Sequence, residues 1–240
     1  MFPIYKKEIK QFFTTIEGYL AIIIFFLISS LALWYIPGGL NIFYNKTASL
    51  LPFFSMAPWI LLILTPAITM KMMSTELLER TDLILFTKPV ETWEIIISKF
   101  LASTTISILS ILPSLIFVFS IYQLSEPVGN VDTGELFCSY VGLIMLIFLY
   151  NAIGLCGSCM SKNNMIAFIS TIIIIVFLLF GFDLLANLNN SEILNYMNLF
   201  THYESISRGV IDTKNIMYFL SLTSCFLILS ILITQQKKHV

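Results

Sequence analysis

The sequence predicts an all-α integral membrane protein with six transmembrane helices, and this prediction comes from its composition and its apolar patterning. The 240 residues are 58% hydrophobic and 11% charged, with a mean hydropathy of +0.90, whereas a soluble domain carries about 25% charged residues. Such a chain cannot cover itself with a polar surface. Because the apolar runs continue from end to end, we expect residues 1–240 to form one membrane domain.

Six charge-free runs have about the 20 residues that a helix needs to cross the hydrocarbon of a bilayer. Prolines lie in the second and third runs, where they predict kinks, because neighbouring groups can satisfy the carbonyls that a proline leaves free. These prolines are Pro58, Pro66 and Pro113, and the six runs are 18–36, 53–70, 100–123, 136–160, 165–182 and 216–234.

Residues 1–17 predict an amphipathic helix at the membrane interface, with a solvated tail as the alternative. One helical face is apolar and the other carries lysines, as in helices that lie in the plane of a bilayer surface. We expect 18–36 to be a retained span, since it is longer than a signal-peptide core and no small-residue cleavage site follows it. The apolar residues of the first helix are Ile4, Tyr5, Ile9, Phe12, Phe13 and Ile16, and the polar ones are Lys6, Lys7, Lys10 and Gln11.

The two long connections are too apolar to be simple loops. In 71–99 we expect helices that lie along the inner membrane surface and are interrupted at Lys88 and Pro89, because the residue before a proline disfavours helical backbone. In 183–215 we expect short helices at the outer membrane face, or a re-entrant segment. Asp183 is expected to be hydrated near the outer interface.

The positions of lysine and arginine predict the orientation in the membrane. Short loops rich in these residues stay in the cytoplasm, so we expect both termini there and an even number of crossings. Of the 13 basic residues, only Lys46, Arg208 and Lys214 then lie outside. The cytoplasmic ones are Lys6, Lys7, Lys10, Lys71, Arg80, Lys88, Lys99, Lys162, Lys237 and Lys238.

The sequence lacks the motifs of several enzyme classes. It contains no GxxxxGK[ST] phosphate-binding loop and no HExxH motif. The two histidines, His202 and His239, fall outside the predicted spans, so we expect no nucleophile and base pair within the membrane. ATP-driven work would need a second protein, and no catalytic residue, metal or cofactor is expected in this chain.

Charge and cysteine positions exclude further classes. A net charge of −1 argues against nucleic acid as a partner, and spans without Asp, Glu, Lys or Arg argue against an ion-coupled secondary transporter. Cys156 and Cys159 form a CxxC without a second pair, which favours helix packing over a metal site. His202, Glu204 and Asp212 match no metal-ligand spacing and are interpreted as solvated polar residues.

Two segments resemble a known family. Residues 76–90 read ELLERTDLILFTKPV and residues 94–102 read EIIISKFLA, a pattern that resembles type-two ABC exporter permeases. Ser98 stands where these permeases usually have glycine, a departure that affects helix packing. Residues 202–212, which read HYESISRGVID, look like the corresponding segment of gliding-motility-associated permease subunits. Together with the six-span layout, the resemblance covers essentially the whole chain.

The resemblance implies a multi-pass permease of a bacterial inner membrane that dimerises, with itself or with a related subunit, and couples to cytoplasmic ABC ATPase subunits. It implies that 1–17 is a connecting helix, that 75–89 contains the coupling helix that docks on the ATPase, and that 187–209 gates the exit. The implied docking residues are Glu76, Glu79, Arg80, Thr81, Lys88 and Pro89, and the implied outer-gate residues are His202, Glu204, Arg208 and Gly209.

Two alternatives to an exporter subunit stay open. The first is a membrane scaffold of an ATP-driven secretion or motility machine that conducts no substrate itself. A conduit needs a cavity at the centre of the dimer, whereas a scaffold can be packed shut. The 21 phenylalanines and the few polar residues in the spans favour a tight or lipid-handling path. The second, an intramembrane enzyme, is disfavoured because catalytic pairs are missing.

Overall fold

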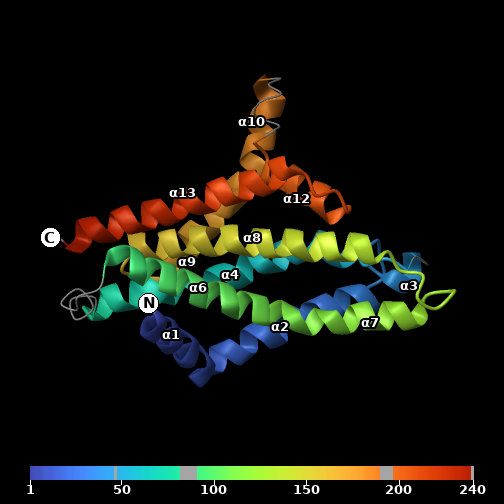
Figure 1. Ribbon diagram of the computed structural model, residues 1–240, viewed down its shortest axis with the longest axis horizontal. Coiled ribbons are helices and arrows are strands. Elements are labelled where there is room, and N and C mark those ends of the chain that lie inside the picture. The colour runs from blue at the N-terminus through green and yellow to red at the C-terminus, as the bar shows by residue number, and fades with distance from the viewer. Residues whose placement is uncertain (46–47, 82–90, 190–196, 239–240) are drawn as a thin grey trace.

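Helices are the only regular secondary structure in the residues that the computed structural model describes, which are 1–45, 48–81, 91–189 and 197–238. Figure 1 shows the long helices as an elongated bundle from which α10 projects. The helices are α1 (Phe2–Thr14), α2 (Ile16–Trp34), α3 (Ile42–Asn45), α4 (Leu51–Glu79), α6 (Thr92–Ile111), α7 (Leu115–Leu124), α8 (Thr133–Met160), α9 (Asn164–Val176), α10 (Phe182–Asn189), α12 (Leu199–Ser207) and α13 (Thr213–Lys238).

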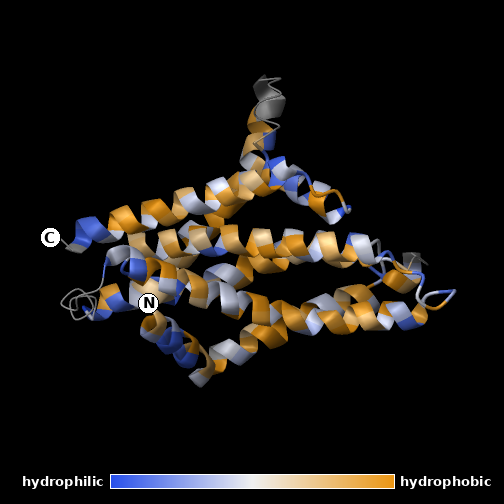
Figure 2. Ribbon diagram, viewed as in Figure 1, coloured by the Kyte–Doolittle hydropathy of each residue, from blue (hydrophilic) through white to orange (hydrophobic). Residues whose placement is uncertain are grey.

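Five helical stretches of the described residues are long and apolar enough to cross a membrane. The helices α1 and α2 pass the same test only as a pair, with a bend of 68° between them. The described part of the chain therefore has five candidate spans, or six if the bent pair is counted as one. In Figure 2, apolar residues cover most of the long helices, and hydrophilic residues gather on α1 and at the C-terminal end of α13. The five stretches are Leu51–Glu79, Thr92–Leu124, Thr133–Met160, Asn164–Leu185 and Thr213–Lys237.

The described parts of the segment 71–99 continue the long helices instead of forming separate surface helices. Helix α4 runs without interruption to Glu79 and ends at Arg80, whose φ of 56° is left-handed. Helix α6 begins at Thr92, after a capping box in which Glu91 and Glu94 satisfy each other's backbone N–H groups. The expected interruption at Lys88 and Pro89 falls in 82–90, outside the described residues.

The prolines are accommodated within continuous helical stretches. Helix α4 contains Pro58 and Pro66, and Pro113 lies in a 3-10 turn, η1 (Leu112–Ser114), that joins α6 to α7. A proline in a helix leaves the carbonyl four residues earlier without its N–H partner, which for Pro58 is the carbonyl of Phe54. The Tyr203 hydroxyl of α12 donates to this oxygen at 2.6 Å, so a distant element satisfies the group that Pro58 frees.

Helix α8 is the centre of the bundle and packs against α4, α6, α9, α12 and α13. Small residues on α8 let its neighbours approach closely, as is common between membrane helices. A Cβ atom at Gly154 would overlap with the hydroxyl of Thr69 on α4, and one at Gly142 would lie 3.1 Å from Ile206 of α12. The absence of side chains at these glycines therefore sets the distance between α8 and its partners.

Enlarging Gly154 tests this packing. Replacing Gly154 with valine should lower the free energy of unfolding by about 1–3 kcal/mol, because a filled interface must shift its backbone. The measurement is unfolding of the purified protein in mixed micelles with a rising fraction of SDS. The control is Gly39→Val, at a position where a new Cβ meets nothing within 4 Å. Equal stability of the two variants would contradict the close contact between α4 and α8.

Candidate functional site

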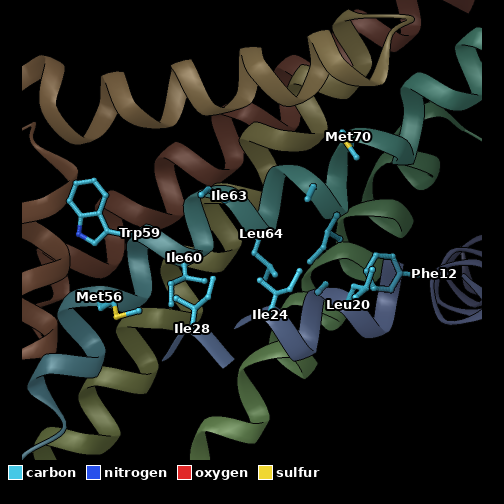
Figure 3. Close-up of a pocket in the computed structure, with 13 residues that line it drawn as sticks. Phe12, Leu20, Ile24, Ile28, Met56, Trp59, Ile60, Ile63, Leu64 and Met70 are labelled. Carbon is cyan, nitrogen blue, oxygen red and sulfur yellow. The ribbon is translucent and has the colours of Figure 1, made fainter. Parts of the chain in front are cut away.

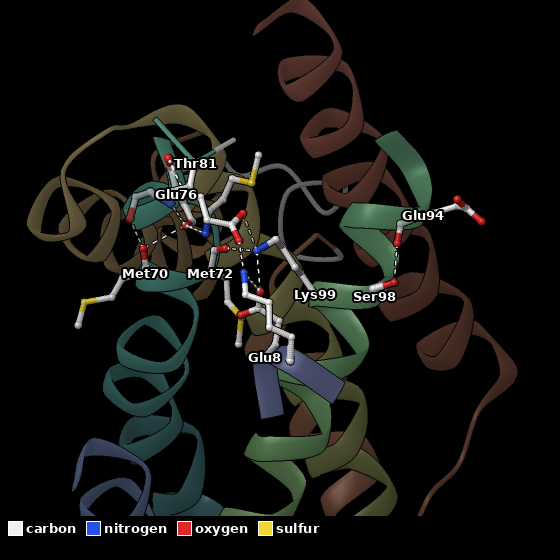
Figure 4. Close-up of polar contacts among 12 residues, drawn as sticks. Glu8, Met70, Met72, Glu76, Thr81, Glu94, Ser98 and Lys99 are labelled. Atoms are coloured by element: carbon white, nitrogen blue, oxygen red, sulfur yellow. Dashed lines mark hydrogen bonds and ion pairs between the residues drawn. The ribbon is translucent and has the colours of Figure 1, made fainter. Parts of the chain in front are cut away.

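A cluster of four charged side chains joins α1, α4 and α6 at one end of the bundle. Lys99 of α6 is fully buried, and its Nζ donates a hydrogen bond to Glu8 Oε1 of α1 at 2.9 Å. The same Nζ lies 2.9 Å from Glu76 Oε2 of α4, an ion pair without hydrogen-bond geometry. It also donates to the carbonyl of Met72. Figure 4 shows Lys99 reaching between the other two helices.

Lys7 completes the cluster from its outer side. Its Nζ donates to Glu76 Oε1 at 2.8 Å and lies 3.7 Å from Glu8 Oε1. Burial lowers the pKa of Lys7, but its hydrogen bond to Glu76 and the nearby carboxylates of Glu76 and Glu8 outweigh burial, and the pKa lies above its ordinary value. Two carboxylates and two ammonium groups make the cluster electrically neutral, which is the condition under which charges are tolerated in a buried site.

Two further contacts hold α1 along α6. The Ser98 hydroxyl donates to the carbonyl of Met1 at 3.1 Å, and the hydroxyls of Tyr5 and Thr105 lie 3.1 Å apart. The Ser98 side chain is thus used for a contact between helices. Polar contacts therefore attach α1 to α6 at Met1, which precedes the helix, at Tyr5 and at Glu8.

This cluster is not among the sites predicted from the sequence. Lys99 is assigned only to the cytoplasmic charges, and Glu8 is given no role. A signal was present, because Glu8 falls with Tyr5, Ile9 and Phe12 on positions i, i+3, i+4 and i+7 of one helical face. A carboxylate on an apolar helical face needs a buried cation as its partner. The position of Glu8 on this face therefore indicates that a basic side chain lies beside it.

The expected docking residues have different surroundings. Glu76 is engaged by Lys7 and Lys99, and only 13% of its side chain is exposed. Glu79 and Arg80 are exposed at the end of α4. The Thr81 hydroxyl lies 3.4 Å from the carbonyl of Glu76, and Lys88 and Pro89 lie outside the described residues. Glu79 and Arg80 are thus the described charges of this set that face solvent, and the docking role of the whole set stays a prediction.

Removing the buried ammonium should destabilise the protein strongly. Lys99→Met should lower the free energy of unfolding by about 3–5 kcal/mol, because it leaves two buried carboxylates with only Lys7 as a counter-charge. Unfolding in mixed SDS micelles measures the loss, and Lys10→Met, on the exposed face of α1, is the matched control. Adding Glu8→Gln to Lys99→Met should restore part of the stability. A loss no larger than that of Lys10→Met would contradict the role given to the cluster.

The expected outer-gate residues lie on or next to α12. His202 is buried, in contrast to the solvated residue expected; its Nδ1 lies 2.8 Å from Asn215 Oδ1 and its ring stacks on Tyr218 at 4.1 Å. Glu204 and Arg208 form an exposed ion pair one helical turn apart. These two side chains line a cavity of about 310 Å³ between α12 and the start of α4.

Helix α12 is held by buried contacts to α4 and α8. Besides the bond from Tyr203 to Phe54, the Ser139 hydroxyl of α8 donates to the carbonyl of Ser207 at 2.8 Å. The helix is followed by Gly209, whose φ of 88° is a conformation that glycine adopts readily. The short helix is thus fixed to the bundle and is more than a surface loop.

Loss of the Tyr203 hydroxyl should loosen this attachment. Tyr203→Phe leaves the Phe54 carbonyl without either its helical or its side-chain partner, and a buried unsatisfied carbonyl costs about 1–3 kcal/mol. We expect a lower thermal midpoint and faster proteolysis at residues 199–207. Tyr35→Phe, at a position that is 82% exposed, is the control and should change neither. Unchanged stability of Tyr203→Phe would contradict the role given to the hydrogen bond from Tyr203 to the Phe54 carbonyl.

The two cysteines of the CxxC lie in the packed interior of α8. Both are buried, and the Thr234 hydroxyl of α13 lies 3.5 Å from Cys159 Sγ. Among the residues that the structure describes, no group of three or more His, Cys, Asp or Glu side chains is arranged to hold a metal ion. The charged cluster and the attachment of α12 are two of the polar arrangements among the described residues.

A helical bundle with several candidate spans and polar clusters at its ends defines a multi-pass membrane protein. The model of the family described as ABC-2 family transporter protein matches residues 2–235, and the chain therefore belongs to that family. No curated protein matches the sequence.

Proposed function

We propose that this chain is the permease subunit of an ABC transporter. It couples ATP hydrolysis by a separate cytoplasmic ATPase subunit to export across, or work at, a bacterial inner membrane. It acts as a dimer with itself or with a related subunit. One observation carries the proposal. The family match spans residues 2–235 and so covers every described candidate span except the last two residues of Thr213–Lys237.

The proposed orientation places both termini in the cytoplasm. The basic residues of the sequence favour this orientation. The start of α1, the end of α13 and the adjoining ends of α4 and α6 lie toward one end of the bundle in Figure 1. The charged cluster lies at the same end, since it joins residues of α1, α4 and α6. We accordingly assign the other end, with α3 and the connection from α7 to α8, to the outside.

The proposed coupling element is 75–89, which docks on the ATPase through Glu79 and Arg80. Helix α4 is continuous from Leu51 to Glu79, so a displacement of its docking end moves the whole helix. Lys99 ties α6 and α1 to the same point through Glu8 and Glu76. Closure of the ATPase would therefore move three helices together, as in other rigid-body transitions.

The same helix leads to the proposed outer gate. The N-terminal part of α4 contacts α12 through Phe54 and Tyr203, and the cavity beside Glu204 and Arg208 lies at this contact. A shift of α4 along its axis would change that cavity. We propose that 187–209, with His202, Glu204, Arg208 and Gly209, controls release on the outer side.

The outer-segment motif supports a finer proposal, that the chain belongs with gliding-motility-associated permease subunits. Deleting its gene in a host that glides, and restoring it on a plasmid, tests this assignment. Loss of gliding with restored movement on complementation supports it. Normal gliding of the deletion strain contradicts the subgroup while leaving the permease proposal intact.

Reversing the exposed docking charges should weaken ATPase binding. In membranes of the native host, Glu79→Arg should reduce the amount of ABC ATPase that co-purifies with the tagged chain by about tenfold or more, because like charges across an interface cost several kcal/mol and about 1.4 kcal/mol already corresponds to a tenfold change. Glu126→Arg is the matched control, since Glu126 is exposed in the connection at the other end of the bundle. Equal recovery of ATPase with both variants would contradict the proposed docking site at the end of α4. Recovery of no ATPase with the unaltered chain would contradict the permease proposal.

A further inference from the structure

Ser158 of α8 inserts its side-chain hydroxyl into the backbone hydrogen bonds of α4. The N–H groups of Met73 and Ser74 each donate to Ser158 Oγ at 3.0 Å, and Ser158 Oγ donates to the carbonyl of Met70 at 3.0 Å. In a regular α-helix, the N–H of Ser74 pairs with the carbonyl of Met70. A hydroxyl from a neighbouring helix therefore contacts both ends of one backbone hydrogen bond, and such an insertion is a known cause of helix bending.

Other side chains bind the same turn of α4. The Ser74 hydroxyl contacts both the Met70 carbonyl and Asn164 Oδ1 at the start of α9, and a serine that binds the carbonyl four residues earlier often bends its helix. Lys99 Nζ donates to the carbonyl of Met72, as Figure 4 shows. The turn from Met70 to Ser74 therefore takes several of its hydrogen-bond partners from α6, α8 and α9 instead of from its own helix.

Two cavities leave space beside α4, before this turn and next to it. The first is a groove of about 490 Å³ between α2 and residues 56–70 of α4, and Figure 3 shows Ile60 and Leu64 facing α2 across it. The second, of about 220 Å³, is lined by Met72 and Thr75 of α4 and by residues of α1. Because densely packed interiors resist movement, α4 can yield toward α1 and α2 more easily than toward α8.

The Ser158 hydroxyl has an alternative partner within its own helix. A serine in a helix can donate to the carbonyl four residues earlier, as Ser110 and Ser230 do. For Ser158 this carbonyl belongs to Gly154, and a rotation of the side chain about χ1 brings the hydroxyl toward it. The N–H groups that Ser158 now binds would then pair with carbonyls of α4. Both arrangements keep these buried groups hydrogen-bonded, so they meet the condition for two accessible states.

We propose that the turn from Met70 to Ser74 is a hinge of α4 and that the Ser158 hydroxyl holds this hinge in its present conformation. Withdrawal of the hydroxyl lets the backbone hydrogen bonds of α4 close and changes the angle between residues 51–69 and the end that carries Glu76. That end is joined to α1 and α6 through Lys99, so the three joined helix ends would change their angle to the rest of α4, as at other hinges. The hinge depends on contacts within the bundle and not on the ABC function.

Hydrogen exchange of the purified protein in micelles tests the hinge. Mass spectrometry with single-residue fragmentation measures the exchange rates of the Met73 and Ser74 amides. In Ser158→Ala these N–H groups should pair within α4, and we expect their exchange to slow about fivefold, the equivalent of the ~1 kcal/mol that one hydrogen bond contributes. A role in packing alone predicts faster exchange, because both N–H groups would lose their partner. Ser110→Ala, at a buried position of α6, is the matched control and should change neither rate.

Spin-label distances test the change of angle. Labels are attached at Leu78→Cys, near the end of α4, and at Ile228→Cys on α13, both at exposed positions, in a chain whose exposed and half-exposed cysteines are replaced by serine. A change of about 20° at the hinge moves residue 78 by ~3 Å. Double electron–electron resonance should therefore show a distance distribution that is shifted by ~1–3 Å in Ser158→Ala and unshifted in Ser110→Ala.

Two results would overturn the proposal. One is exchange of the Met73 and Ser74 amides that is faster in Ser158→Ala, or equal to that of the unaltered chain. The other is slower exchange with an unchanged distance distribution, since the turn would then tighten without bending. Size-exclusion profiles show whether Ser158→Ala folds. If it does not, Ser158→Cys decides by the same exchange measurement, because a thiol is a weaker hydrogen-bonding group than a hydroxyl and should slow exchange in the same direction.

Discussion

A fully buried ammonium group must find its counter-charges inside the protein, and Lys99 imposes this requirement on three helices. Glu8 of α1 and Glu76 of α4 approach its Nζ at 2.9 Å, and neither could move away without leaving a charge unpaired at a cost of several kcal/mol. The requirement fixes α1 across the ends of α4 and α6. Because α2 follows α1 after the bend at Thr15, the N-terminal part of the chain is thereby tied to the bundle.

Helix α4 carries polar constraints at both of its ends. At the end with the charged cluster it supplies Glu76 and the Met72 carbonyl to Lys99. At the other end, the carbonyl that Pro58 releases is bound by Tyr203 of α12. Between these ends the helix is continuous and packs against α8, where Gly154 leaves room for Thr69. A single continuous helix therefore connects the segment proposed to meet the ATPase with the segment proposed to open outward.

Much of the fold could be predicted from the sequence, because bilayer thickness sets the length of an apolar run whatever its neighbours are. The helical class and five or six candidate spans follow from that rule. The length of apolar runs does not predict that α4 continues to Glu79. The charged residue Glu76 lies in this last part of the helix, and it is covered because it pairs with Lys99 and Lys7. His202 was expected to be hydrated and is instead covered by Tyr218 and Asn215. Both differences arise from partners far along the chain, which helical periodicity does not reveal.

The most direct test of a rigid unit formed by α1, α4 and α6 is the distance between α1 and α6 in the working complex. Spin labels are attached at Lys6→Cys and Leu101→Cys, both at exposed positions, in a chain in which Cys138 and Cys225 are replaced by serine. Double electron–electron resonance then measures the distance between the two labels in the ATPase complex, with and without trapped nucleotide. A rigid unit predicts the same distance distribution in both states. A distribution that shifts or splits when the ATPase closes would show that α1 separates from α6, and would contradict the structural role given to Lys99.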